Sequence, residues 1–289
     1  MSNEQSQKEA ENKEQPSFLR VIVHSFFIIP FLIAVFCLLI FAGMHLLTDE
    51  KRTAYDYLED IKTGGLTKRW QGAFELSKIL ANPKLLPSDE HFSNEVIKVF
   101  EHARQDDPRV RQYLALAMGR TGRREFLEPL LEGLREEKEE NLRAIIYALG
   151  MLKDKKASEP LANYLESSDP RTRSIAVVAL GNIADPGSKV YLEKALYDPE
   201  PNVQWGAAIS LAKMSDSSGK DILFKLLDRN YLSHYPEVDA YEQNQLILSA
   251  IDAASFLNDS HLNEKIKDLS QNDPNLKIRA AALTQLQKS

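Results

Sequence analysis

The stretch from 169 to 196 reads DPRTRSIAVVALGNIADPGSKVYLEKAL, and its pattern recurs along the chain every 31 residues. The recurrence produces columns of small residues and columns of leucine. These are Gly119, Gly150, Gly181 and Ala212; Ala117, Ala148, Ala179 and Ser210; Leu130, Leu161, Leu192 and Leu223; and Leu134, Leu165, Leu196 and Leu227. A fixed period of about 20 to 50 residues is typical of solenoids, whose units must stack to bury their apolar faces. The period therefore predicts an all-α solenoid.

Each 31-residue unit is predicted to contain two helices, because its apolar residues recur with helical rather than strand-like spacing. An acid followed by proline opens the first helix in three units, at Asp107-Pro108, Asp169-Pro170 and Glu200-Pro201. This pair places an N-cap before a proline at the first helical position. A turn follows, with Asp154, Asp185 and Asp216 in one column as expected caps for the second helix. The second helix carries both leucine columns, which lie four residues apart on one face.

The units resemble HEAT-like repeats, in particular the short class first recognised in phycobilisome lyases. The resemblance rests on three segments that fit the form D-P-x-V-R-x-x-A-x-x-A-L-G followed by a leucine-spaced helix, namely 107–134, 169–196 and 200–227. It implies antiparallel helix pairs, best defined over 94–228. Beyond these limits the pattern degrades, as expected at the ends of a solenoid.

A second feature is an uncharged run of 19 residues from Phe26 to Met44, FFIIPFLIAVFCLLIFAGM. At about 1.5 Å per residue in a helix, it is long enough to cross the hydrocarbon core of a bilayer. A cleaved signal peptide has a shorter apolar region and a small-residue cleavage site. The flanks of Cys37 do not fit a lipoprotein signal, and a core helix this apolar would need covering on all sides. The run therefore predicts an uncleaved, single-pass transmembrane helix over 21–47.

The sequence says less about the side of the membrane on which the repeats lie than about the anchor itself. Lys8, Lys13 and Arg20 precede the span, whereas a larger set follows it, namely Lys51, Arg52, Lys62, Lys68 and Arg69. Basic residues near the ends of a span favour the cytoplasm, so the count leans towards cytoplasmic repeats in a cell-membrane protein and leaves the other orientation open. The only cysteine lies in the span, so disulfides give no further information on the compartment.

These features divide the chain into four segments. They are a polar tail at 1–20, a transmembrane helix at 21–47, a juxtamembrane helical linker at 48–66 and a HEAT-like solenoid at 67–289. Gly64-Gly65 is expected to end the linker helix. Six helix pairs and a terminal capping helix are expected in the solenoid. An insertion at 230–243, NYLSHYPEVDAYEQ, breaks the period.

Catalytic and cofactor motifs are missing from the sequence. No HExxH, CxxC or His-Glu pairing offers a metal site, and the iron-binding His-Glu pairs of deoxyhypusine hydroxylase, another HEAT-like protein, have no counterpart. The chain has no GxSxG elbow, and Gly119 to Gly122 follows no strand. A formal net charge of −6 argues against binding nucleic acid through its phosphates. No catalytic residue, metal or cofactor is therefore expected.

Partner contacts are expected from aromatic and arginine side chains, which are frequent at binding hot spots. The candidates are Arg69, Trp70, Trp205, Tyr231, Tyr235 and Tyr241. Trp205 occupies a column that holds Gln112, Arg143 and Ser174 in other units, and the three tyrosines belong to the insertion. Packing is the alternative role for the tryptophans and tyrosines. The second helices are expected to face the inner curve and form a mixed, mildly acidic groove.

The sequence thus predicts a non-catalytic interaction scaffold that tethers or regulates a protein partner, expected to be a membrane complex. The alternative is a ligand-handling enzyme of the bilin lyase type, which the repeat class implies. A soluble lyase has no need of an anchor, and the chain shows no pigment-handling cluster. Fold alone does not establish function.

Overall fold

The computed structural model describes residues 24–48, 52–137 and 139–287. The chain divides into two compact units, Met1–Arg52 and Thr53–Ser289. Each unit is described by itself. The predicted polar tail and the first three residues of the predicted span lie outside the described residues.

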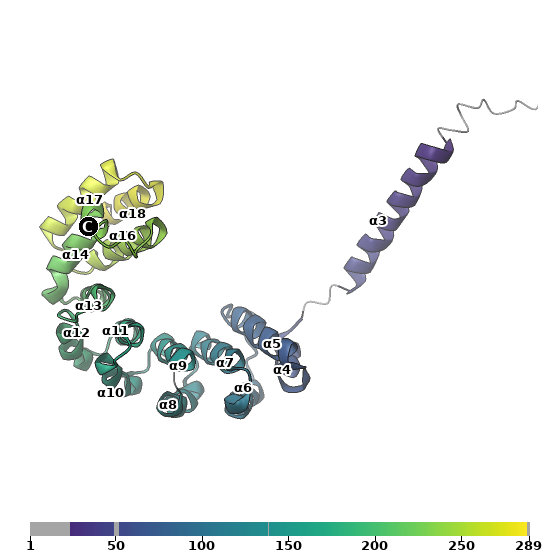
Figure 1. The fold of residues 1–289 in the computed structure, drawn as a ribbon, viewed down its shortest axis with the longest axis horizontal. Helices are drawn as coiled ribbons and strands as arrows, with labels where there is room; N and C mark the ends of the chain where they lie inside the picture. Colours follow the sequence, from purple (N-terminus) through teal and green to yellow (C-terminus); the bar gives the residue numbers. More distant parts are fainter. Residues whose placement is uncertain (1–23, 49–51, 138, 288–289) are drawn as a thin grey trace, which may run out of the picture. The chain divides into compact units, whose positions relative to one another are not determined.

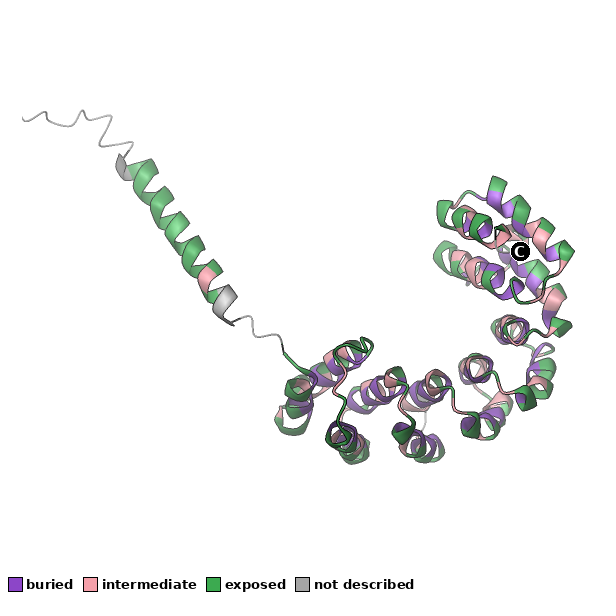
Figure 2. Cartoon of the chain, turned by 180° about the vertical axis from the view of Figure 1, so that it is seen from behind, coloured by how far each residue is buried: buried purple, intermediate pink, exposed green. Residues whose placement is uncertain are grey.

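The first unit contains one long helix. A π-helical turn, η1 (His24–Ile28), leads into α3 (Ile29–Thr48). The window Phe26–Met44 has a mean hydropathy of 2.9, and none of it is buried. Figure 2 shows almost all of this window as exposed. The unit therefore supplies one helix that is long and apolar enough to cross a membrane.

The second unit is built from helices and short turns (Figure 1). Its α-helices are α4 (Ala54–Thr63), α5 (Leu66–Ile79), α6 (Glu90–His102), α7 (Pro108–Thr121), α8 (Leu127–Glu136), α9 (Glu139–Leu152), α10 (Ser158–Ala162), α11 (Pro170–Ile183), α12 (Lys189–Ala195), α13 (Pro201–Lys213), α14 (Lys220–Leu226), α15 (Arg229–Leu232), α16 (Ala240–Ala254), α17 (Ser260–Asn272) and α18 (Leu276–Leu286). From α5 to α17 they form six antiparallel pairs, with α15 in the insertion. The terminal helix α18 follows, so the pair count expected from the sequence agrees with the structure.

Helix α4 belongs to the solenoid unit, although the sequence analysis assigned it to a linker over 48–66. A capping box between Thr53 and Asp56 begins it, and Gly64 follows its last turn. Leu58 and Ile61 are buried against the neighbouring helices. The structure therefore begins this compact unit at Thr53, because the apolar face of α4 packs on α5 and α6.

The helix pairs form two rows. Figure 1 shows α5, α7, α9, α11 and α13 on the inner side of the curve, with α6, α8, α10 and α12 on the outer side. The expectation that the second helices face the inner curve is therefore wrong. Small residues let the first helices approach closely, and this row becomes the shorter, concave one. Charged side chains of the second helices, such as Glu128 and Lys194, lie on the convex row.

The column of small residues is explained by contacts between successive first helices. A Cβ atom added to Gly119 would lie 2.7 Å from the Cα atom of Ala148, and one added to Gly150 would lie 2.7 Å from that of Ala179. Gly181 packs in the same way on Ser210. Each glycine therefore meets the small residue of the next repeat, where no side chain would fit.

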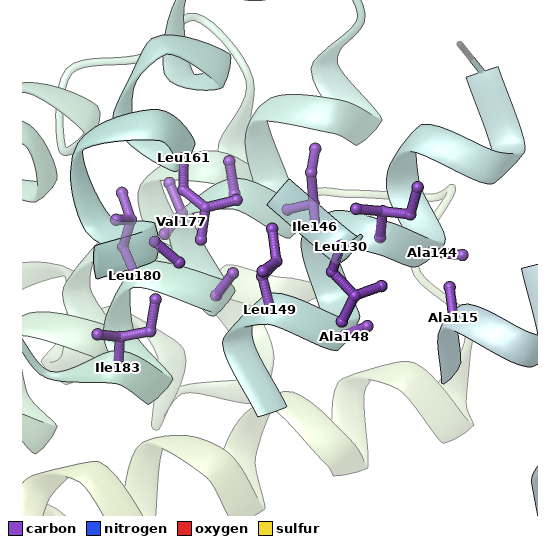
Figure 3. Close-up of a cluster of buried hydrophobic side chains, with 14 of the residues drawn as sticks. Ala115, Leu130, Ala144, Ile146, Ala148, Leu149, Leu161, Val177, Leu180 and Ile183 are labelled. Carbon is purple, nitrogen blue, oxygen red and sulfur yellow. The ribbon is translucent and has the colours of Figure 1, made fainter. Parts of the chain in front are cut away.

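The core lies between the two rows. Figure 3 shows part of it, in which side chains from both rows, such as Leu130, Leu149 and Leu161, lie together. All three are fully buried. The first leucine column is buried in every unit, whereas Leu165 of the second column is only partly buried. The repeat period thus records the spacing of core positions.

The expected caps form in part. The Asp107 side chain accepts a hydrogen bond from the backbone of Arg109, and Asp169 accepts from Arg171 and Thr172. Asp154 and Asp216 cap the turns that lead into the second helices. Within the described contacts, Glu200 and Asp185 make no such side-chain bond.

Polar side chains join α11, α13 and α18 to the end of the preceding helix pair, a feature that the sequence analysis missed. Arg173 donates to the carbonyl oxygen of Ser167 at 2.8 Å, and Gln204 donates to that of Asp198 at 2.6 Å. In the terminal helix, Arg279 donates to the carbonyl oxygen of Asp273 at 2.6 Å. In all three cases the acceptor lies six residues before the donor. The shared geometry continues the repeat into α18.

Candidate functional site

A groove opens on the concave row where α9, α11, α13 and α16 meet. Its volume is about 520 Å³. The lining residues are Glu140, Arg143, Pro170, Arg171, Ser174, Ile175, Val178, Glu200, Asn202, Trp205, Gly206, Ile209 and Leu246. Because successive first helices lie side by side, the groove collects the same helix face from several repeats. Its volume is within the range of small-molecule pockets and of sites that admit a few side chains of a partner.

The apolar part of the groove follows the repeat period. Val178 and Ile209 occupy one column with Leu116 and Tyr147, and Leu246 of α16 continues the lining. Val178 is 38% exposed and Tyr147 is 42% exposed, in contrast to the leucine columns. A stripe of accessible apolar side chains therefore runs across neighbouring first helices. Such stripes mark interaction surfaces in soluble domains.

Charged side chains form the rim. Arg143 donates to Asp169 at 2.9 Å and also pairs with Glu140, so the structure already uses its guanidinium. The Arg171 side chain is 78% exposed and lies 3.8 Å from Asp169, which makes it the more available cation. A hydrogen bond from the Thr172 hydroxyl, backbone donors and the charge of Arg143 lower the pKa of Asp169. The rim thus presents fixed charges of both signs.

Trp205 is a buried residue in the lining of the groove. It is 1% exposed, and its ring lies 4.9 Å, centroid to centroid, from that of Tyr235. Its Nε1 donates to the Tyr231 hydroxyl at 3.2 Å, and the Tyr235 hydroxyl donates to the same oxygen at 3.0 Å. This hydrogen bond, with burial, raises the pKa of Tyr235 to about 12. The three residues form an aromatic cluster that joins α13 to the insertion.

The structure thus brings together three of the six residues proposed for partner contact. Buried Trp205 supports the groove through packing, while Tyr231 and Tyr235 are half-buried beside it. Tyr241 is 70% exposed at the start of α16. Their role in binding stays a prediction, because the structure contains no partner.

Arg69 and Trp70 belong to a different place, on α5. Arg69 pairs with Asp106, and the guanidinium of Arg109 lies 4.3 Å from the centre of the Trp70 ring. Both side chains are half-buried and link the α5 pair to the α7 pair. They are therefore engaged in contacts between repeats.

Val178, Ile209 and Leu246 are apolar groove residues that sequence reasoning missed. The available signal was the apolar column Leu116, Tyr147, Val178 and Ile209. Periodicity alone makes such a column indistinguishable from a core column. Only the tertiary contacts of each helix face show whether an apolar column is accessible or buried.

The groove is lined by apolar and charged side chains. In the described part of the chain, no group of three or more His, Cys, Asp and Glu side chains could hold a metal ion. The groove offers accessible aliphatic surface, an exposed arginine and rim carboxylates. These groups suit a partner segment with apolar side chains and charges near its ends.

Comparison with protein families identifies the repeats. Residues 97–172 and 158–232 match the family model of HEAT repeats. This region of the chain is therefore similar to HEAT repeats. No curated protein sequence matches the chain.

Among solved structures, the chain is similar to the complex of CpcE and CpcF of phycocyanin lyase from Nostoc sp. PCC7120, with 19% identity, a TM-score of 0.54 and coverage of 83% of this chain and 96% of that one. A computationally designed armadillo repeat protein for modular peptide recognition shares 16% identity over 80% of this chain and 97% of its own, with a TM-score of 0.41. Human deoxyhypusine hydroxylase shares 15% identity over 82% of this chain and 85% of its own, with a TM-score of 0.35. The likeness to the phycocyanin lyase complex shows an α-solenoid fold.

Proposed function

We propose that the chain is a non-catalytic, membrane-anchored scaffold that holds a protein partner, part of a membrane complex, in its concave groove. The observation that carries the proposal is the accessible apolar stripe across α9, α11 and α13. Exposed aliphatic and aromatic side chains in register cost solubility. A partner that covers them recovers about 25 cal/mol per Å² of apolar surface.

The helix α3 supports the membrane part of the proposal through its length and its exposed apolar surface. An anchor would confine the search for a partner to the plane of the bilayer and raise the effective concentration of both proteins. On this proposal the protein is single-pass in the cell membrane. The excess of basic residues after the span favours cytoplasmic repeats.

The test compares two exposed valines, Val178 in the groove and Val190 on the convex row. They are 38% and 52% exposed. Full-length Val178→Glu and Val190→Glu would each be purified from crosslinked native membranes, and the accompanying proteins identified by mass spectrometry. We expect a membrane partner that the parent chain and Val190→Glu retain, and that Val178→Glu loses at least tenfold.

Three results would contradict this proposal in different ways. A partner retained equally by both variants would exclude the groove. A chain released by alkaline carbonate would exclude the anchor. Recovery of the chain with a bound pigment or other small molecule, and without a protein, would favour the alternative of a ligand-handling enzyme of the bilin lyase type.

A further inference from the structure

A second surface lies at the turns between first and second helices, and its charge differs from that of the chain as a whole. The last turn of α7 and the turns after α7 and α9 carry six cationic side chains, which are Arg120, Arg123, Arg124, Lys153, Lys155 and Lys156. Two acids, Glu125 and Asp154, lie among them. This group of six is called the basic edge below. It stands out in a chain whose formal net charge is −6.

The repeat provides an internal control for this surface. The four-residue turns at 122–125, 153–156, 184–187 and 215–218 occupy the same columns, and their first residues all have positive φ angles. The first two turns read GRRE and KDKK, whereas the last two read ADPG and SDSS. Since the same backbone turn forms without cations in the later repeats, folding does not require the lysines of the second turn.

Many of these charges are available to a ligand. A depression of about 450 Å³ is lined by Gly122, Arg124, Leu152, Lys153, Asp154, Lys155 and Lys156. Side-chain exposure is 75% for Arg124 and 61% for Lys156, whose acidic partners lie at 3.2 Å and 3.7 Å. Within the described residues, Lys153 and Lys155 have no acidic partner. Four cations and one carboxylate thus surround one depression.

Arg120 and Arg123 contribute two further positive charges to the basic edge, outside the lining of the depression. Arg120 donates to the carbonyl oxygen of Ser77 at 2.7 Å, and Arg123 donates to the hydroxyl of Ser93 at 2.7 Å. Neutral acceptors such as these hold a guanidinium in place without cancelling its charge, although Arg123 also lies 3.9 Å from Glu125. The field over the depression is therefore positive, and it suits an anion that carries several oxygen atoms, such as a phosphate group.

We infer that the basic edge binds the phosphate groups of anionic phospholipids at the membrane surface. This inference rests on the proposed anchor. Only five residues separate the end of α3 from the start of α4, so an inserted chain would hold its first repeats near the headgroups. Of the four equivalent turns, the cations occupy the two nearer the anchor in sequence, in the second and third helix pairs, and are missing from the two further away. Basic residues held close to a bilayer surface attract its anionic lipids.

The experiment places the full-length protein in lipid nanodiscs, where both faces of the bilayer are accessible. One set contains phosphatidylcholine alone, and the other contains about one third phosphatidylglycerol. Exposed lysines are modified with an amine-reactive reagent and quantified by peptide mass spectrometry. We expect Lys153, Lys155 and Lys156 to be labelled at least threefold more slowly in the anionic discs. Lys194 and Lys225, on the convex row, should be labelled equally in both.

Two further conditions sharpen the test. Salt at 0.5 M should remove the protection, because it shortens electrostatic range to a few ångströms. The double variant Lys153→Glu/Lys155→Glu should lose the protection of Lys156, whereas Lys194→Glu/Lys225→Glu should keep it. Equal circular dichroism spectra for the two variants would show that the loss is not due to unfolding.

Other outcomes overturn the inference and identify what replaces it. Equal labelling in neutral and anionic discs excludes the lipid. If inorganic phosphate protects the three lysines equally in neutral discs, the depression binds a free anion. If the lysines are protected only in native membranes and in neither kind of disc, the ligand is an acidic protein. A chain that elutes apart from the discs contradicts the anchor and hence the proposed function, a result distinct from an inserted chain without lipid protection.

Discussion

Two contacts between neighbouring parts of the solenoid, called joints below, are packed with side chains of very different size. Between α9 and α11, Gly150 meets Ala179 so closely that no further atom fits. Between α13 and the insertion that precedes α16, the indole of Trp205 packs against the rings of Tyr231 and Tyr235. The first joint is filled by backbone contact, and the second by large side chains. The period of 31 residues can therefore be interrupted at the insertion, because large aromatic side chains fill the space there instead of a close contact between small residues.

The largest expected effect breaks the aromatic joint. Trp205→Ala should destabilise the repeats by about 4 kcal/mol, because it removes a fully buried ring and leaves a cavity beneath the groove. Urea unfolding of the full-length protein in detergent, followed by circular dichroism, measures the change. A loss below about 1 kcal/mol would contradict a supporting role for this ring.

A milder change tests the hydrogen bonds of the same joint. Tyr231→Phe keeps the ring but removes the oxygen that accepts from both Trp205 and Tyr235. Leaving the buried Trp205 donor without an acceptor costs about 1 to 3 kcal/mol. Tyr241→Phe is the matched control, because that side chain is 70% exposed and its substitution should have almost no effect.

The third prediction tests the close contact between α9 and α11. Gly150→Ala should destabilise by about 2 kcal/mol, since the new methyl group must push the backbone of α11 away, and this outweighs the better helix propensity of alanine. The control is Gly206→Ala, also inside a first helix. There the nearest atom is a methyl carbon of Val177 at 3.2 Å. Its effect should stay within about 1 kcal/mol, and equal losses for both variants would show that close backbone contact is not the cause.

The smallest effect concerns a third kind of joint, made by surface ion pairs between α4 and α6. Hydrogen bonds from Lys62 and Lys98 lower the pKa of Glu95 from 4.5 to about 2. The contribution of this carboxylate to stability is thus fully present above about pH 4.5, and it is lost as the pH falls towards 2. Glu95→Gln should flatten the decline of the melting temperature over this window. An unchanged pH profile would mean that this ion pair does not stabilise the joint.

The sequence predicted much of the regular region because its signals are local and repeated. The Asp107 and Asp169 caps, the small-residue contacts and the buried leucine column Leu130 to Leu223 all follow from the positions that recur. The assignment of α4 to a linker differed from the structure because its apolar face is short and lies outside the period. The groove was missed because Val178 and Leu130 look alike in a periodic sequence, although one is accessible and the other buried.

The sequence by itself determined the all-α repeat architecture and the presence of one helix apolar enough to span a membrane. Both depend on composition and spacing along the chain. Only the tertiary structure decided which row faces inward, where the concave groove opens and that Trp205 lies beneath it. It also gathered Arg124 with Lys153, Lys155 and Lys156 around one depression. These features depend on how successive repeats pack against each other, and a spacing pattern does not specify the angle between them.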